Sequence, residues 1–195
     1  MGIQQFVAAY RVDHDRLRTI IPDGYKSLRR VLRINAEVNS NGEITIELNT
    51  PVERPGFKGW LNVASWSSCN TSIHLLIGDD GAYEFTTPFL TLGFLPSGVF
   101  SECPAEKDSH GCIYLRDGKE TLLTYRPVAE RKEFCDFSFH WRFSDGDSFG
   151  KSDGKMIAAP FEPVRHIYPS LACTPELAAK IPCLQVLGAY TLYVR

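Results

Sequence analysis

Paired turn signals recur along this chain, and they constrain its fold more than any other feature. An asparagine or aspartate followed by glycine stands at 41–42, 80–81, 117–118, 145–146 and 153–154. Such pairs supply the positive φ angles that tight hairpins need. Five of them between strand-like runs predict an antiparallel meander rather than alternating strands and helices.

Alternation of apolar and polar residues supports strands on both sides of the first turn. Apolar side chains occupy every second position through 32–38 and 44–48, and the same period continues through 135–143. A period of two places the two sets of side chains on opposite faces of a sheet. We therefore expect residues 33–38 and 43–49 to pair as an antiparallel hairpin about Asn41-Gly42.

Helices are expected to be few and short. Asp13 or His14 opens one, because aspartate is a good N-cap, and Pro22-Asp23-Gly24 ends it. Thr174 is expected to cap a second helix, with Pro175 at its first position. Together with the strands, this pattern predicts an α+β chain that is mostly β.

The composition bounds the class of protein. The 195 residues, 44% hydrophobic and 23% charged, predict one domain over 1–195. A net charge of −2 without a basic cluster argues against nucleic-acid binding, and no apolar stretch is long enough to span a bilayer. Without the pattern of a signal peptide at the N-terminus, a cytoplasmic location is expected, with the six cysteines reduced and no metal site. The oligomeric state stays open, a homo-oligomer included.

Three segments resemble the acetoacetate decarboxylase family. They are Tyr10-Arg11-x-Asp13-x-Asp15-x-Leu17-Arg18-x-x-x-Pro22 followed by Arg33, then Pro51-Val52 with Gly56-Phe57-Lys58-Gly59, and finally Ala159-Pro160 with Ile167 and Pro169. The resemblance implies an antiparallel β-barrel or cone with a small-molecule pocket inside. It also implies cofactor-independent chemistry on a keto acid or a related carbonyl compound, so that the expected partner is a small carboxylate or carbonyl ligand.

The family's Schiff-base lysine has no obvious counterpart in this sequence. In those enzymes a pocket lysine, with its pKa lowered by a second cation, forms an imine with a β-keto acid. Counting from Gly56–Gly59 places that site near residues 81–85, where Glu84 and Phe85 stand instead of lysines. A carboxylate cannot form an imine, so Glu84 is a candidate general acid or base. Lys58 and Lys107 are the remaining lysine candidates.

A polar row on the predicted hairpin supplies the candidate binding residues. Arg33, Asn35 and Glu37 share one face with Glu47 and Asn49, and this face either meets solvent or lines a pocket. In a pocket, Arg33 would bind a substrate carboxylate through two hydrogen bonds, and Glu47 would join Glu84 as an acid–base candidate. The remaining candidates are His140, on the polar side of an aromatic strand, and Trp66, as a wall of the pocket.

Two other functions compete with this interpretation. A non-catalytic binding protein would keep the same barrel and lose the chemistry. Separately, Ser109-His110-Gly111-Cys112-Ile113 resembles the catalytic signature of L,D-transpeptidases, in which the cysteine attacks an acyl donor. Here Tyr114 replaces the arginine that follows in that family, and we expect Cys112 to behave as an ordinary strand cysteine.

Overall fold

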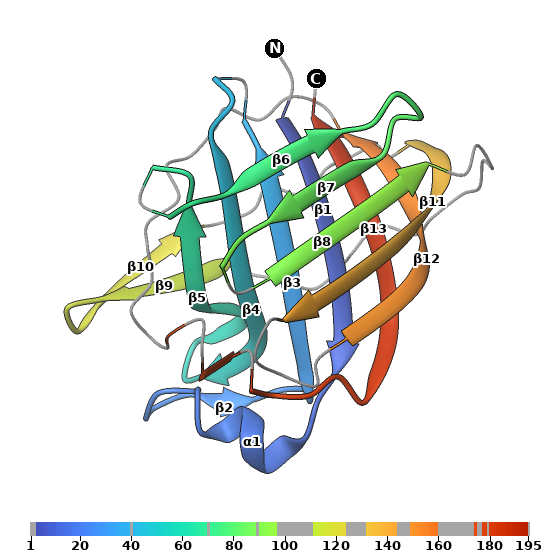
Figure 1. Ribbon diagram of the computed structural model, residues 1–195. Coiled ribbons are helices and arrows are strands. Elements are labelled where there is room, and N and C mark those ends of the chain that lie inside the picture. Colours follow the sequence, from blue (N-terminus) through green and yellow to red (C-terminus); the bar gives the residue numbers. More distant parts are fainter. Residues whose placement is uncertain are drawn as a thin grey trace.

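The structure is a computed structural model that describes residues 3–39, 41–69, 71–88, 90–96, 111–123, 132–143, 149–159, 174, 177–178 and 180–194. The prediction of a mostly β chain is confirmed (Figure 1). The described elements are β1 (Ile3–Arg11), α1 (His14–Arg18), β2 (Lys26–Ser27), β3 (Val31–Val38), β4 (Ile44–Arg54), β5 (Phe57–Ser67), β6 (His74–Ile77), β7 (Tyr83–Thr86), β8 (Leu90–Pro96), β9 (Cys112–Arg116), β10 (Lys119–Leu123), β11 (Lys132–Phe143), β12 (Phe149–Ala159) and β13 (Gln185–Val194).

The strands form one sheet of 13 strands in the described part of the chain. Their order is β10-β9-β5-β4-β3-β1-β13-β12-β11-β8-β7-β6, with β2 paired to β4. Most neighbours are antiparallel, as the turn signals predict, but β12 pairs with β13 in parallel and β5 pairs with β9 in parallel. The meander is therefore interrupted twice, by connections that no local turn signal marks.

Three of the five expected turns connect paired strands as predicted. Gly42 lies between β3 and β4, Gly81 between β6 and β7, and Asp117-Gly118 between β9 and β10, all with positive φ. The fourth, at 145–146, lies outside the described residues. The fifth prediction is wrong, because Asp153-Gly154 lies inside β12, where Gly154 pairs with Phe137 on one side and Ala189 on the other.

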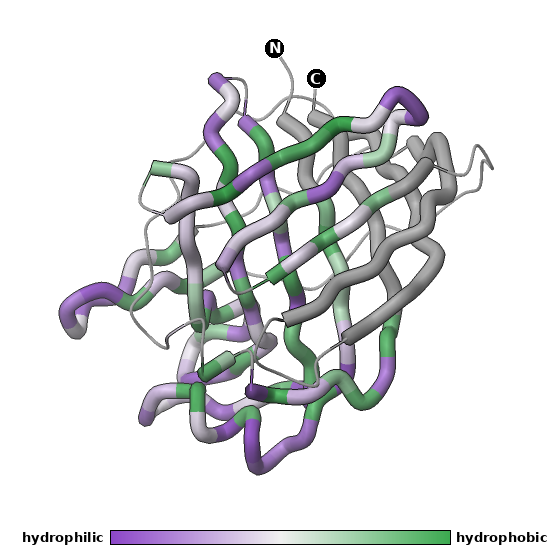
Figure 2. The backbone as a smooth tube through the Cα atoms, viewed as in Figure 1, coloured by the Kyte–Doolittle hydropathy of each residue, from purple (hydrophilic) through white to green (hydrophobic). Residues whose placement is uncertain are grey.

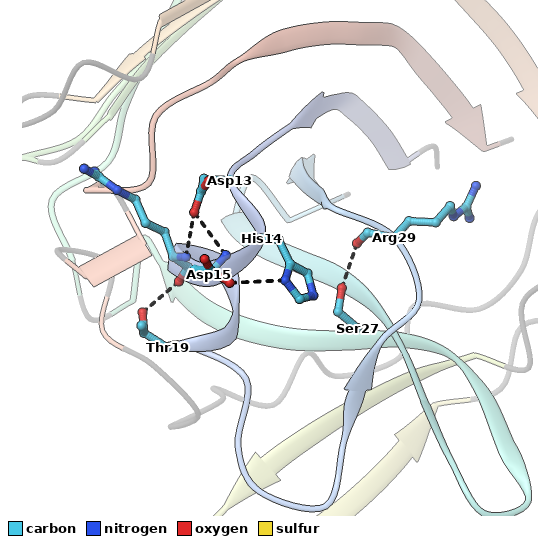
Figure 3. A network of polar contacts seen from close by, with 7 residues as sticks. Asp13, His14, Asp15, Thr19, Ser27 and Arg29 are labelled. Carbon is cyan, nitrogen blue, oxygen red and sulfur yellow. Dashed lines mark hydrogen bonds and ion pairs between the residues drawn. The ribbon is translucent and has the colours of Figure 1, made fainter.

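The short helix α1 begins as its cap residue predicts (Figure 3). The Asp13 carboxylate accepts hydrogen bonds of 3.0 Å from the backbone N–H groups of Asp15 and Arg16. These bonds satisfy two of the donors that a helix start leaves without partners. Leu17 is the buried residue of α1 and packs into the main core. In the second predicted helix, the hydroxyl of Thr174 accepts a bond of 3.3 Å from the N–H of Leu177, as expected for a cap.

The apolar core lies between two layers of the sheet. In Figure 1, strands β6, β7 and β8 cross in front of β1, β3 and β4. Phe6 of β1 joins the layers, because its ring centroid lies 5.3 Å from that of Phe85 in β7 and 4.3 Å from that of Phe94 in β8. Apolar residues of β3 and β4, among them Ile34 and Leu48, fill the same core. Figure 2 shows the alternation along these strands that gives each of them one apolar and one polar face.

Candidate functional site

The polar face of β3 and β4 is buried. Arg33 is 7% exposed, Glu37 8% and Glu47 3%, while Asn49 is fully buried and Asn35 is partly buried. The apolar core covers the opposite face of these strands, so the sheet is covered on both sides here. Burying charged and amide groups is costly unless they are hydrogen-bonded or paired, which makes this arrangement a candidate site. We call these five residues, with Trp60, Asn62, Cys112 and Tyr114 around them, the buried polar face.

Strand pairing places these side chains in adjacent rows. Arg33 lies opposite Asn49, and Asn35 lies opposite Glu47, in the antiparallel register of β3 and β4. Opposed residues in a sheet point to the same face, which is why two sequence-distant pairs meet. A register shift between Leu48 and Asn49 brings Asn62 of β5 opposite Asn49. The shift adds an amide to the site that strict alternation along β5 would not predict.

Glu47 is the centre of the hydrogen bonding. Its Oε1 accepts a bond of 2.7 Å from the Tyr114 hydroxyl, and its Oε2 accepts one of 3.3 Å from Asn49 Nδ2. Burial raises the pKa of Glu47 above its ordinary value, opposed by the bonds from Tyr114 and Asn49 and by the charge of Arg33. Desolvation is the largest of these effects, so folding favours the protonated form of Glu47 more than the unfolded chain does.

The amides extend the network from Glu47 toward β5 and β9. Asn49 Oδ1 accepts a bond of 3.0 Å from Asn62 Nδ2, which is also 3.3 Å from the Ala64 carbonyl oxygen. The Cys112 thiol lies 3.7 Å from the same Asn49 oxygen. The two ends of the Asn49 amide are thus fixed, and its orientation toward Glu47 is set by Asn62.

Arg33 lies over an indole ring. Its guanidinium carbon is 3.7 Å from the centroid of the Trp60 ring, which is a cation–π contact. Stacking fixes the plane of the guanidinium, whose N–H donors all lie in that plane. The arrangement suits the bidentate binding of a carboxylate.

The structure separates the predicted site residues into two groups. Arg33, Asn35, Glu37 and Glu47 lie together in the buried polar face. Glu84 is exposed on β7, in register with Gly93 of β8, and His140 of β11 is in register with the same glycine. The backbones of the two candidates are thus at matched positions, and the Glu84 side chain lies on the opposite face of β7 from Phe85 and the core. The side chain of His140 lies outside the described residues.

Trp66 does not lie in the buried polar face. It lies opposite Ile46, packs into the apolar core and is 4% exposed. The indole beside Arg33 belongs to Trp60 instead. Composition offers no signal to choose between them, since both tryptophans lie on one strand and only the register decides which face each one takes.

Sequence reasoning also passed over Tyr114 and Asn62 as site residues. Tyr114 reaches Glu47 from a strand 67 positions away, and nothing local in the sequence indicates that contact. Its only sequence signal was its place directly after the cysteine motif. The described part of that motif, 111–113, does not have the geometry of a catalytic thiol. Cys112 is fully buried, and burial raises the pKa of its thiol, with the nearby Glu47 adding to the effect. His110 lies outside the described residues.

Neither a metal cluster nor a spanning helix occurs in the described part of the chain. No group of three or more histidine, cysteine or acidic side chains is arranged to hold a metal ion among those residues. Over the same residues, no helix has the length and apolar character needed to cross a membrane.

Comparison with known proteins identifies the fold. No protein-family signature matches the sequence, and no curated protein matches it. Among solved structures, an acetoacetate decarboxylase from Legionella pneumophila superposes with a TM-score of 0.54 at 13% identity, over 98% of this chain and 80% of that one. A second acetoacetate decarboxylase structure superposes with a TM-score of 0.53 at 11% identity, over 97% of this chain and 81% of that one. The chain therefore has the acetoacetate decarboxylase-like fold that its sequence motifs suggested.

Proposed function

We propose that this protein is an enzyme that acts on a small keto acid, with Arg33 binding the carboxylate and Glu47 serving as a proton donor. The observation that carries the proposal is a buried, hydrogen-bonded carboxyl group on the same face as an arginine that lies over an indole. An ionisable group with a strongly perturbed environment beside a charged anchor is typical of a catalytic site rather than of a passive pocket. The likeness in fold to acetoacetate decarboxylases supports this class of substrate.

A neutral Glu47 would assist several reactions of keto acids in the same way. Enolisation of a keto acid and decarboxylation of a β-keto acid both place developing negative charge on the ketone oxygen. An acid that donates a hydrogen bond or a proton to this oxygen lowers the energy of the transition state. Tyr114 and Asn49 hold the Glu47 carboxyl in one orientation, so that little reorganisation is needed. The proposal therefore extends to decarboxylation and enolisation, and to dehydration that proceeds through an enol.

Binding of keto acids should depend on Arg33. In Arg33→Met the side chain keeps much of its bulk over Trp60 but loses the charge and the donors, so we expect the affinity for pyruvate or acetoacetate to fall at least tenfold, given about 1.5–3 kcal/mol for a charge-assisted hydrogen bond. Isothermal titration calorimetry measures this directly. Arg29→Met is the matched control, because Arg29 is exposed outside the buried polar face and its loss should leave the affinity unchanged. Equal affinity in Arg33→Met would leave the proposed site without its anchor.

Turnover distinguishes an enzyme from a protein that only binds. Incubation of pyruvate in D₂O would exchange its methyl protons if the protein promotes enolisation, and proton NMR follows the loss of the methyl signal. Acetoacetate in parallel reports decarboxylation by the appearance of acetone. We expect Glu47→Gln to remove whichever activity the native protein has, while carboxylate binding through Arg33 persists. Binding without either reaction would favour the non-catalytic alternative.

Schiff-base chemistry is not expected. Glu84 occupies the position counted for the family's lysine, and Lys58 is two-thirds exposed with its Nζ 3.6 Å from the Glu53 carboxylate. Borohydride added with acetoacetate or pyruvate should therefore leave the intact mass unchanged. A stable adduct at Lys58, at Lys107, which lies outside the described residues, or at any other lysine would contradict this expectation. Lys155 is the position to inspect first, because the backbone register runs from Glu47 through Asn35, Val7 and Tyr190 to it.

A further inference from the structure

The hairpin of β9 and β10 carries Tyr114 to Glu47 but joins the sheet along a short seam. Within the hairpin, five residue pairs run from Cys112–Leu123 to Arg116–Lys119. Against β5, only Cys112 and Ile113 are in register, opposite Trp60 and Leu61. One further backbone bond of 2.9 Å runs from the Trp60 N–H to the Gly111 carbonyl. The registered pairs end at Ile113, so Tyr114 is the first residue of β9 beyond the seam.

A second attachment lies on the opposite strand of the same hairpin. Glu120 of β10 accepts a bond of 2.6 Å from the Arg54 guanidinium, and its other oxygen accepts a short bond from the Tyr25 hydroxyl. Burial and the neighbouring Glu120 raise the pKa of Tyr25 to about 12, so the phenol keeps its proton and donates. Arg54 is the last residue of β4, the strand that also carries Glu47, and Tyr25 directly precedes β2, which pairs with β4. Glu120 itself lies opposite Leu115, the residue after Tyr114.

We propose that Glu120 is a positioning residue, which with Arg54 and Tyr25 latches the β9–β10 hairpin to the end of β4 and so keeps Tyr114 on Glu47. The proposal rests on the role of Glu47 in the proposed function, but the latch can be tested without any ligand. Both attachments reach the same strand, β4, one at its middle and one at its end. Two fixed points on one strand, added to the seam with β5, define the orientation of the hairpin beyond Ile113.

The close approach of two glycines supports a docked hairpin with little room to shift. A Cβ atom added at Gly59 would lie 2.6 Å from the Gly111 carbonyl oxygen, closer than real Cβ contacts allow. The hairpin therefore approaches β5 as nearly as a glycine permits. This contact is backbone to backbone, so it cannot adjust by a change of rotamer.

Cys112 reports the state of the latch. Its thiol is fully buried at the seam and has a raised pKa, so an alkylating reagent reaches it only when the hairpin separates from the sheet. The alkylation rate of Cys112 in the native fold is then proportional to the population of the open hairpin. Cys69, which is exposed, serves as an internal standard for reagent reactivity in the same molecule.

The test compares Glu120→Gln with Glu53→Gln under iodoacetamide, with peptide mass spectrometry to quantify each cysteine. Glu53 neighbours Arg54 on β4 and pairs with exposed Lys58, so its change alters the same region without touching the hairpin. We expect Glu120→Gln to raise the Cys112 rate about fivefold, the size of effect typical for losing a partly exposed ion pair with a hydrogen-bonded partner. Tyr25→Phe, which removes one hydroxyl, should raise it less, and Glu53→Gln should leave it unchanged.

A second readout separates positioning from general stability. In the opened site water reaches Glu47, which removes the desolvation that dominates its environment, so its titration midpoint should move down in Glu120→Gln. Infrared spectroscopy follows the carbonyl band of the protonated acid, assigned as the band that disappears in Glu47→Gln. An unchanged Cys112 rate in Glu120→Gln, or an equal rise in Glu53→Gln, would overturn the latch whether or not a keto acid binds. Absence of keto-acid binding in the native protein would sink the proposed function and leave the latch standing.

Discussion

Replacing Phe6 with alanine is expected to destabilise the protein by about 3–5 kcal/mol, the usual cost of removing a buried aromatic side chain. Phe6 is 2% exposed, and its ring contacts those of Tyr83, Phe85 and Phe94 at centroid distances of 4.3 to 5.3 Å. These three partners belong to the opposite layer, so the substitution removes a contact that holds the two layers together. The void would be lined by rigid aromatic rings, which collapse poorly into it.

Equilibrium unfolding in urea measures this effect. Leu76→Ala is the control, because Leu76 is 66% exposed on β6 and its loss should change the free energy of unfolding by less than about 0.5 kcal/mol. A cost below about 1 kcal/mol for Phe6→Ala would mean that the layers are not joined through this residue. The site lies on the other face of β3 and β4, so a folded Phe6→Ala protein should retain carboxylate binding.

Local patterns in the sequence were sufficient for the hairpin that carries the site. The turn at Asn41-Gly42 and the alternation on both sides of it predict β3 and β4 in register, and the structure has Arg33 opposite Asn49 as that register requires. The alternation of apolar and polar residues cannot show what covers each face of the hairpin. Both faces of this hairpin are buried, one by the apolar core and one beside β9, and a polar strand face is usually solvated.

Non-local pairing accounts for what the sequence did not predict. The parallel pairs β5–β9 and β12–β13 bring together strands that are far apart in the chain. No short-range pattern in the sequence predicts such pairs. Tyr114 enters the site only through the first of these pairs, and Asn62 only through the register shift beside Leu48. Asp153-Gly154 shows the opposite error, since a strong local turn signal is overridden when strands on both sides offer hydrogen bonds.

The pH dependence of stability should change most in Glu47→Gln. Burial raises the pKa of Glu47 in the folded protein, whereas in the unfolded chain it titrates near its ordinary value of 4.5. As the pH rises above that value, the unfolded chain releases this proton and the folded protein retains it. The folded state then binds more protons, so its stability falls by about 1.4 kcal/mol per pH unit until the folded pKa is reached.

Glutamine removes that slope while preserving the shape of the side chain. Its amide cannot ionise, and its oxygen can accept the bond from the Tyr114 hydroxyl, but its NH₂ group cannot accept the bond from Asn49. That loss is a constant offset, so the native and variant proteins are compared by the slope of stability against pH. Above pH 5 the advantage of Glu47→Gln should then grow by up to about 1.4 kcal/mol per pH unit until the folded pKa of Glu47 is reached, measured by urea unfolding at several pH values. Glu84→Gln is the matched control, because Glu84 is exposed on β7 and its replacement removes the same charge without touching a buried site.

The two curves also decide what Glu47 can do chemically. Diverging curves require a carboxylic acid that stays protonated while the unfolded chain ionises, and such a group can donate a proton to a ketone oxygen. Parallel curves would mean that Arg33 and the bonds from Tyr114 and Asn49 outweigh burial and hold an ionised carboxylate instead. In that case Glu47 would be a base, and the proposed proton donor would have to be sought in the Tyr114 hydroxyl that contacts it.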